Sequence, residues 1–167
     1  RRHPDAFIGE VGIITAERIR LAAIMRLGLP QEVVVALRDP AGATGVIYSL
    51  LLSADDSTRA AQLEILNGDP SLTSIEQVTT LAAQIQNLQP QHKFALAEFA
   101  VPTLRRLNPE RYAAFATTTQ QLVECDGAIE LFEYALLKMV QRQLRSFFDG
   151  GQPAKTSYGK VNDVLPQ

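Results

Sequence analysis

The sequence predicts an all-α fold, a bundle of about seven to nine helices, and three observations support this prediction. Apolar residues recur at helical spacing along most of the 167 residues. Glycine, proline, asparagine and aspartate interrupt these periodic stretches at short intervals, as they do between helices. Residues 42–53 are rich in β-branched side chains, but no partner strand is evident elsewhere in the sequence.

The composition and charge are those of an ordinary globular domain. Hydrophobic residues make up 46% and charged residues 20%, and the net charge of −2 gives no basic excess for nucleic-acid binding. A single cysteine excludes an intrachain disulfide, which fits a reducing compartment. The longest apolar run, residues 45–52, is far shorter than the roughly 20 residues that span a bilayer, so we expect this chain not to cross a membrane.

In the first half of the chain, capping and breaking residues delimit five predicted helices. These are residues 15–26, 31–38, 42–53, 58–66 and 75–88. Gly28 and Gly68 are C-terminal signals, Pro30 favours a helix start, and residues 53–57 hold several N-cap candidates. We expect residues 42–53 to form a buried helix, because helices flank this run closely. The residues expected to share an apolar face are Ile19, Ala22, Ala23 and Leu27 in the first helix, and Ile75, Val78, Leu81, Ile85 and Leu88 in the last.

In the second half, two prolines shape the prediction. Pro102 lies inside the helical pattern of residues 93–107, and because proline removes a backbone hydrogen bond, we expect a kink or two short helices there. Pro109 stands between Asn108 and Glu110, which together give an N-cap, a proline at N1 and an acid in the first turn of another helix. That helix should run to Glu124 and turn inward Tyr112, Phe115, Ala116, Leu122 and Val123.

Residues 122–148 are the stretch around which we expect the rest of the chain to pack. Asp126 is a favoured N-cap and Gly127 allows a positive φ, so a long helix should begin at Asp126 and stop at Gly150. Apolar side chains point in nearly all directions in its first half, and such a helix is a buried one, so we place it at the centre of the bundle. The residues expected on its main apolar face are Ile129, Phe132, Leu136, Met139, Val140 and Phe147, with Leu131, Tyr134, Ala135 and Leu137 in other directions.

The sequence carries no motif that predicts catalysis. His3 lies near the beginning and His92 lies beside a predicted loop, and neither has a nucleophile or an acid at a diagnostic spacing. An H-E-x-x-H helix, a phosphate-binding loop and a G-x-G-x-x-G turn are all missing from the sequence. We therefore expect this chain not to be an enzyme by itself and to hold no catalytic or cofactor-binding residue.

The Asp126-Gly127 turn is similar to the second half of an EF-hand calcium loop. With Gly127 at loop position 6, Asp126 falls at position 5 and Glu133 at position 12. Leu122 then falls at position 1, where an acid is needed. A helix cap and a tight turn therefore explain the pattern better than a calcium site. The metal candidates of the chain are Asp126, Glu130 and Glu133, and we expect no bound metal there.

Cys125 and a small basic cluster are the other candidates for chemistry. Cys125 has no adjacent cation, cysteine or histidine, so we expect a small, partly buried side chain and not a reactive thiol. Arg105, Arg106 and Arg111 are expected to belong to a solvated face, with an anion site as the alternative.

Two segments together resemble a known family. Residues 39–66, DPAGATGVIYSLLLSADDSTRAAQLEIL, and residues 94–144, from FALAEFAVPTLRRLNPERY to FEYALLKMVQRQL, are similar to the helical C-terminal region of certain bacterial membrane zinc metallopeptidases. These form the HtpX/CAAX-prenyl-protease-like family, often described as zinc-dependent proteases with chaperone function. The D-G-x-x-x-x-x-E pattern of Asp126, Gly127 and Glu133 also resembles the TerB-like all-α fold, which implies a TerB-like helical hairpin around this turn.

The resemblance covers residues 3–148 and implies a non-catalytic accessory domain, regulatory or protein-binding, of a membrane-bound zinc metallopeptidase. The family's H-E-x-x-H zinc motif has no counterpart here, so no catalytic residue or zinc ligand is carried onto this chain. The peptidase domain, with its zinc and membrane helices, is expected upstream of Arg1, since the chain begins without Met. The implied location is the cytoplasmic side of the inner membrane, tethered through the parent protein. The implied partner is that peptidase domain or another protein.

The pattern of breaking residues and helical periodicity divides the chain into a lead-in or linker at 1–14, a helical domain at 15–148 and an irregular tail at 149–167. Two other functions remain open. One is a free-standing helical scaffold that binds protein through a groove, since residues 54–66 are similar to the second helix of HEAT-type repeats, although no second copy follows at a fixed period. The other is a TerB-like module that senses a divalent cation through the three metal candidates.

Overall fold

A computed structural model describes residues 18, 19, 22–70, 72, 74–125, 127 and 130–149. Within these residues the chain is helical and has no β-strand, so the all-α prediction is confirmed. The helices are α2 (Gln31–Ala36), α3 (Pro40–Leu51), α4 (Asp56–Asn67), α5 (Ile75–Ile85), α6 (Pro90–Leu104), α7 (Pro109–Glu124) and α8 (Leu131–Phe148). A further helical stretch covers residues 22–26. The predicted lead-in, nearly all of the tail, Asp126 and Ile129 lie outside the described residues.

Side chains at the helix starts explain where several helices begin. In α4 the Asp55 carboxylate accepts from the backbone N–H of Thr58 at 2.9 Å. In α7 the Asn108 side chain accepts from the N–H of Arg111 at 2.8 Å. Such bonds satisfy the open donors of the first turn, and the bond from Thr58 holds the pKa of Asp55 below its usual value. The starts predicted within residues 53–57 and at Asn108 are therefore confirmed.

The described residues before α2 carry exposed apolar side chains. Ile19 is 64% exposed and Met25 is 75% exposed. The apolar face expected for residues 15–26 is therefore not packed at Ile19. The helical stretch gives way to a turn at Gly28, whose φ of +60° is a left-handed conformation that glycine adopts without strain. The predicted stop at this glycine is confirmed.

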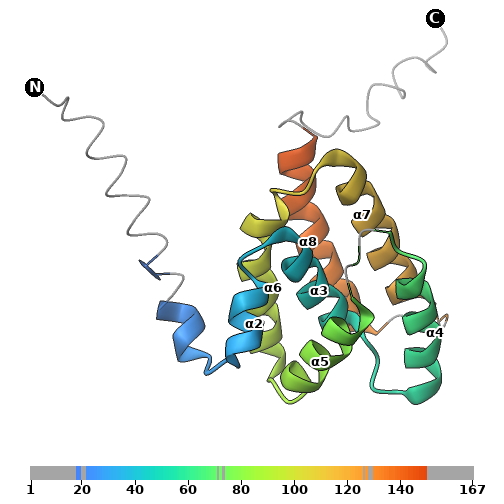
Figure 1. The fold of residues 1–167 in the computed structure, drawn as a ribbon, viewed down its shortest axis with the longest axis horizontal. Helices are drawn as coiled ribbons and strands as arrows, with labels where there is room; N and C mark the ends of the chain where they lie inside the picture. The colour runs from blue at the N-terminus through green and yellow to red at the C-terminus, as the bar shows by residue number, and fades with distance from the viewer. Residues whose placement is uncertain are drawn as a thin grey trace, which may run out of the picture.

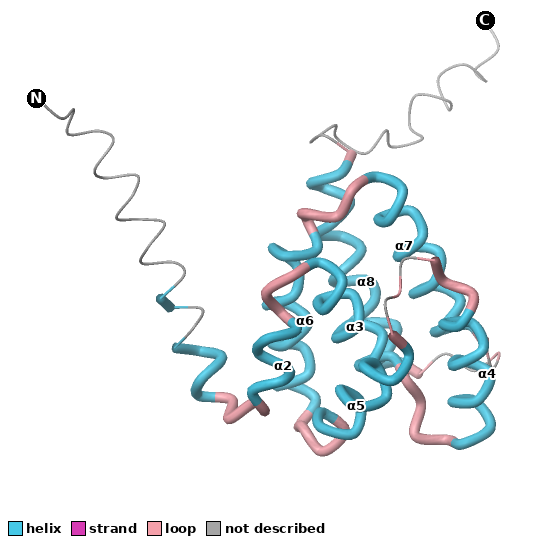
Figure 2. The backbone as a smooth tube through the Cα atoms, viewed as in Figure 1, coloured by secondary structure: helices cyan, strands magenta, loops and turns pink. Residues whose placement is uncertain are grey.

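The helix α3 lies at the centre of the bundle (Figure 1, Figure 2). Ten of its twelve residues are buried, and it packs against α2, α5, α6 and α7. The segment Pro40–Leu51 has no charged side chain, so every direction around the helix axis can face protein. The expectation that residues 42–53 form a buried helix is therefore confirmed.

The helix α8 is not the centre of the bundle, contrary to the prediction. It begins at Leu131, with Glu130 at the N-cap, and not at Asp126. Leu131 is 81% exposed and Phe147 is 51% exposed, so neither side chain packs inward. Charged side chains alternate with the apolar ones, which makes α8 amphipathic, and it buries one stripe against α6 and α7. The buried residues are Leu136, Leu137, Val140 and Leu144.

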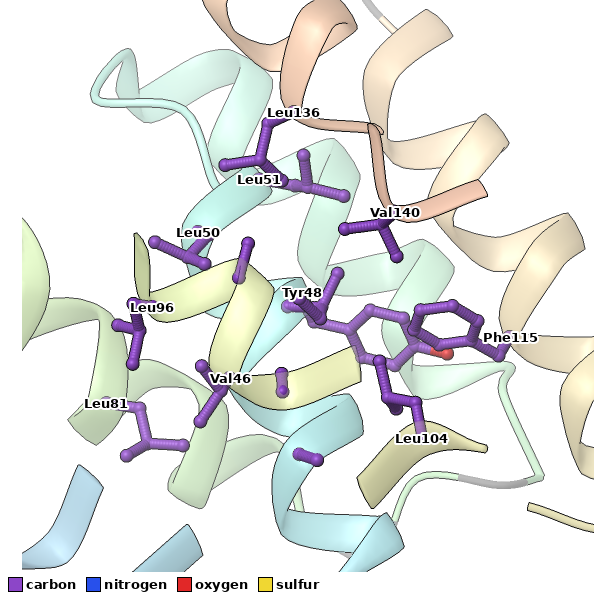
Figure 3. Packing of buried hydrophobic residues seen from close by; sticks show 14 of the residues in the cluster. Val46, Tyr48, Leu50, Leu51, Leu81, Leu96, Leu104, Phe115, Leu136 and Val140 are labelled. Atoms are coloured by element: carbon purple, nitrogen blue, oxygen red, sulfur yellow. The ribbon is translucent and has the colours of Figure 1, made fainter. Parts of the chain in front are cut away.

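Tyr48 of α3 lies in the middle of the core (Figure 3). Its side chain is fully buried, and its hydroxyl donates a 2.5 Å hydrogen bond to a carboxylate oxygen of Asp69. Its ring stacks on Phe115 of α7, with the ring centroids 5.8 Å apart. A buried aromatic ring whose polar tip is satisfied contributes both apolar area and directional contacts. The central helix is fixed against α7 in this way.

Gln62 of α4 links three segments through a side chain that is only 1% exposed. Its Nε2 donates to the carbonyl oxygens of Leu51 and Leu122, both at 2.9 Å. Its Oε1 accepts from the backbone N–H of Ser53 at 2.8 Å. The two carbonyls belong to the last turns of α3 and α7, where carbonyl oxygens lack N–H donors within their own helix. One glutamine therefore joins α4 to the ends of both helices.

The helix α6 is continuous from Pro90 to Leu104. Pro102 sits in its last turn, so the two short helices considered for this region do not form. A proline this close to the end disturbs only the final hydrogen bonds of the helix. Thr103 donates from its Oγ1 to the carbonyl oxygen of Leu37 at 2.7 Å, which ties α6 to the residue after α2.

Candidate functional site

An open groove lies between α2 and α5, which contact each other. Its volume is about 680 Å³, within the range of roughly 300–1,000 Å³ that is usual for binding clefts. Among its lining residues Ala36 and Leu81 are buried, whereas Val35 is 49% exposed. A half-exposed apolar wall beside a buried apolar floor offers a packing position for another apolar group.

Helical spacing explains why the groove residues face one another. On the α5 side they recur at i, i+3, i+4 and i+7, which places them on one face of a helix. On the α2 side Glu32, Val35 and Ala36 share a helix face, whereas Asp39 comes after the end of α2 and is the N-cap of α3. The two sets are Glu32, Val35, Ala36 and Asp39 on the α2 side, and Gln77, Thr80, Leu81 and Gln84 on the α5 side. At 1.5 Å per residue, the α5 side extends for roughly 12 Å, or about two helical turns.

The polar side chains of the groove are two carboxylates, Glu32 and Asp39, together with three glutamines and a threonine. Gln84 donates its Nε2 to a carboxylate oxygen of Glu32, an orientation that follows because an ionised carboxylate only accepts. The Oε1 of Gln84 is buried without a hydrogen-bond partner in the described structure. Asp39 uses its Oδ2 to accept from the N–H of Gly42 at 3.3 Å, which caps α3. Neither lysine nor arginine is among the described residues that line the groove.

A smaller pocket of about 190 Å³ includes two of the three metal candidates. Glu130 is exposed at the N-cap of α8, and Glu133 is half-buried in its first turn. Arg59 and Lys93 line the same pocket, and positive side chains oppose the binding of a divalent cation. Within the described ranges no three histidine, cysteine, aspartate or glutamate side chains are grouped as metal ligands. The third candidate, Asp126, lies outside those ranges.

The turn between α7 and α8 has the backbone geometry expected of its glycine. Gly127 has a φ of +71°, as the sequence predicted. Leu122, at the first ligand position of an EF-hand alignment, is 1% exposed and belongs to the apolar core. Cys125 is partly buried at the C-cap of α7, as expected. The turn therefore serves to connect two packed helices.

Two of the three arginines in the predicted basic cluster contact the protein itself. Arg106 donates from Nη1 to the carbonyl oxygen of Arg38 at 3.1 Å. The guanidinium of Arg105 lies 5.7 Å from the ring centroid of Phe147. Arg111 is exposed in the first turn of α7. Arg105 and Arg106 therefore help to hold the end of α6 against neighbouring segments.

A second open groove, of about 530 Å³, lies between α4 and α7. Its α7 side is lined mainly by small side chains, and Ile65 on its α4 side is half-buried. The described residues of this groove include no large exposed apolar side chain comparable to Val35. It therefore offers less apolar surface to a partner than the groove between α2 and α5. Its exposed acid, Glu64, is a useful control position.

Comparisons with known protein families, with curated proteins and with solved structures give no match to this chain. Within the part of the chain that the structure describes, no helix combines the length and apolar character needed to cross a membrane.

Sequence reasoning did not predict the groove between α2 and α5. The signal for it is the run of three valines, Val33 to Val35, in a helix of six residues. Successive residues of a helix point about 100° apart, so a helix packed on one side cannot bury all three. Val33 is buried, and Val35 is left half exposed. Val35 is therefore the one exposed large apolar side chain among the described residues that line this groove.

Proposed function

We propose that this chain is a non-catalytic accessory domain that binds protein, and that the groove between α2 and α5 is its binding surface. The observation that carries the proposal is the half-exposed Val35 beside the buried Leu81, in an open groove between α2 and α5. Grooves of this kind accept the apolar face of a peptide or helix, and a few apolar residues supply most of the affinity.

We further propose that the parent protein is a membrane-bound zinc metallopeptidase whose catalytic domain lies upstream of this chain. The resemblance of residues 39–66 and 94–144 supports this link. The D-G-x-x-x-x-x-E pattern of Asp126, Gly127 and Glu133 supports the TerB-like part of the proposal through its resemblance alone. In this arrangement the zinc and the general base belong to the upstream domain. This chain then binds protein substrates or the peptidase domain on the cytoplasmic side of the inner membrane.

Deleting this domain from the parent protein tests the proposal. The shortened enzyme should keep its rate on a short peptide but turn over a protein substrate roughly tenfold more slowly, a loss of about 1.4 kcal/mol of binding. Val35→Lys should reproduce the loss, because it places a charge on the apolar wall. Glu64→Lys, in the other groove, is the matched control and should have no effect. Proteolysis by the isolated chain would contradict the accessory role.

The gene sequence upstream of the Arg1 codon separates the metallopeptidase from the free-standing scaffold. An H-E-x-x-H motif on a helix, together with apolar segments of about 20 residues, would support the metallopeptidase. A start codon close by, with neither feature, would remove the peptidase from the proposal. The protein-binding scaffold, which uses the same groove, would then be the function to test.

A further inference from the structure

We propose that the smaller pocket, which Arg59 and Glu130 both line, binds a small zwitterion of the free α-amino acid class. Such a ligand carries a carboxylate and an ammonium group on one carbon atom, together with a short apolar side chain. This inference goes beyond the proposed function and does not depend on it, because the pocket shares no described lining residue with the groove between α2 and α5. Three observations support it, namely the two signs of charge in the pocket, its unpaired cations and its size.

Side chains of both charge signs line this pocket, and they come from different helices. Arg59 belongs to α4 and Lys93 to α6, whereas Glu130 and Glu133 belong to the start of α8. The two larger grooves each have carboxylates but neither lysine nor arginine among their described lining residues. The glutamates would repel a simple anion, and the basic side chains would repel a simple cation. A ligand that carries both charges can place each of them beside side chains of the opposite sign.

The two cations of the pocket need an anionic partner. Arg59 and Lys93 are half-buried, and the side chain of neither forms an ion pair or a hydrogen bond with a described residue. A cation that loses part of its water on burial is destabilised unless an anion replaces that water. A ligand carboxylate would supply this anion. The guanidinium of Arg59 suits a carboxylate, because its paired N–H groups match the two carboxylate oxygens.

The pocket also offers acceptors for an ammonium group. Glu130 is exposed at the N-cap of α8, and its side chain makes no cap bond there in the described structure. Leu50 lines the pocket from the last turn of α3, where carbonyl oxygens lack N–H donors within their own helix. An ammonium group has three N–H donors, so it can bond to a carboxylate and to a carbonyl oxygen together. The α8 side and the end of α3 therefore favour the positive end of a zwitterion.

The volume of the pocket, about 190 Å³, sets the size of the ligand. A cavity of roughly 150 Å³ holds one benzene molecule, so this pocket has room for a ligand of roughly six to nine non-hydrogen atoms. Clefts for larger ligands usually measure roughly 300–1,000 Å³. Leu52 and Phe132 are half-buried apolar residues of the lining, against which a short aliphatic side chain can pack. Leucine and smaller aliphatic amino acids fit this description.

Isothermal titration calorimetry of the 167-residue chain with three matched compounds tests the inference. L-Leucine carries both charges, isocaproate lacks the ammonium group and isoamylamine lacks the carboxylate, while all three have the same aliphatic chain. We expect leucine to bind at least about tenfold more tightly than either analogue. The inference is overturned if leucine does not bind at millimolar concentration, or if either analogue binds as tightly as leucine, because one charge would then suffice.

Substitutions that remove one charge test the two halves of the site separately. Arg59→Gln should weaken the binding of leucine by about tenfold without weakening that of isoamylamine, which has no carboxylate. Glu130→Gln should weaken the binding of leucine without weakening that of isocaproate.

Two exposed residues outside the pocket supply the matched controls. Arg111→Gln removes a positive charge from α7, Glu64→Gln removes a negative charge from α4, and both should leave the affinity for leucine within about twofold. Melting temperatures of the four variants report whether each remains folded. Equal losses from Arg59→Gln and Arg111→Gln would overturn the inference, because the total charge of the chain, and not this pocket, would then determine binding.

Discussion

The helices α3 and α8 are both rich in apolar residues, yet they occupy different places in the bundle. Ten of the twelve residues of α3 are buried, against four of the eighteen residues of α8. The charged residues of α8 are Glu133, Lys138, Arg142 and Arg145, whereas α3 has none. Each charged side chain requires a solvated direction, so α8 cannot be surrounded by protein. The absence of charged residues therefore predicts the central helix better than the number of helix faces that carry apolar side chains.

Among substitutions in the two helices, those of their tyrosines should differ most in their effect on the free energy of unfolding. Tyr48→Ala removes a fully buried ring and its contacts to Phe115 and Asp69, and should lower the free energy of unfolding by about 3–5 kcal/mol. Tyr134 is 41% exposed, with its ring centroid 5.3 Å from the Nζ of Lys138, so Tyr134→Ala should cost less than about 1 kcal/mol. Urea denaturation measures both values, and equal costs would contradict the central position of α3.

A pair of leucines within α8 tests which of its faces is buried. Leu136 is fully buried in the apolar core (Figure 3), so Leu136→Ala should cost about 2–5 kcal/mol. Leu131 is 81% exposed, and Leu131→Ala should change the stability by less than about 0.5 kcal/mol. Thermal and urea unfolding of the two variants, side by side, give the comparison. A large loss of stability from Leu131→Ala would mean that the first turn of α8 is buried, as the sequence predicted.

Two glycines within α3 should respond in opposite ways to the same change. A Cβ at Gly42 would lie 2.6 Å from the Oδ1 of Asp39 and closer still to the carbonyl oxygen of Ala36, so Gly42→Ala should cost about 1–3 kcal/mol. A Cβ at Gly45 would meet Leu81 at 3.7 Å, an ordinary contact. Gly45→Ala should therefore stabilise the protein by up to about 1 kcal/mol, through helix propensity. Melting temperatures report the sign of each effect.

The smallest expected effect concerns the helix starts. The side chain of Asp39 caps α3, whereas Glu130 makes no side-chain cap bond at the start of α8 in the described structure. Glu130→Ser introduces a cap with Glu133 three residues later, which is the capping-box spacing, and should stabilise the protein by about 0.5–1 kcal/mol. Asp39→Ala should cost a similar amount. An unchanged melting temperature for Glu130→Ser would mean that α8 does not start at Leu131.

The helices themselves were predictable because their signals are local. Asp55 and Asn108 cap the helices that follow them, and Gly28 and Gly127 have the positive φ that their turns require. The packing order was not predictable in the same way. It depends on which apolar helix the other helices can surround. That depends in turn on where charged residues fall along the whole chain, because charged side chains are rarely buried.

The groove was harder to predict than the fold, because it forms between segments far apart in the sequence. Val35 and Leu81 line one groove only because α2 and α5 both pack against α3. The metal candidates came from a local pattern, and the structure places two of them, Glu130 and Glu133, in a pocket that also contains Arg59. The local sequence pattern therefore predicted the turn between α7 and α8, but not the positive side chain of Arg59 beside the two glutamates.

Hydrogen exchange across the free chain tests most directly whether α3 is the centre of the fold. The amides of Val46, Ile47 and Leu50 should exchange only through global unfolding, because their helix is surrounded by protein. The amides of the first two turns of α8, around Tyr134, should exchange faster through local opening. Slower exchange at the start of α8 than in the middle of α3 would contradict the account and return α8 to the centre.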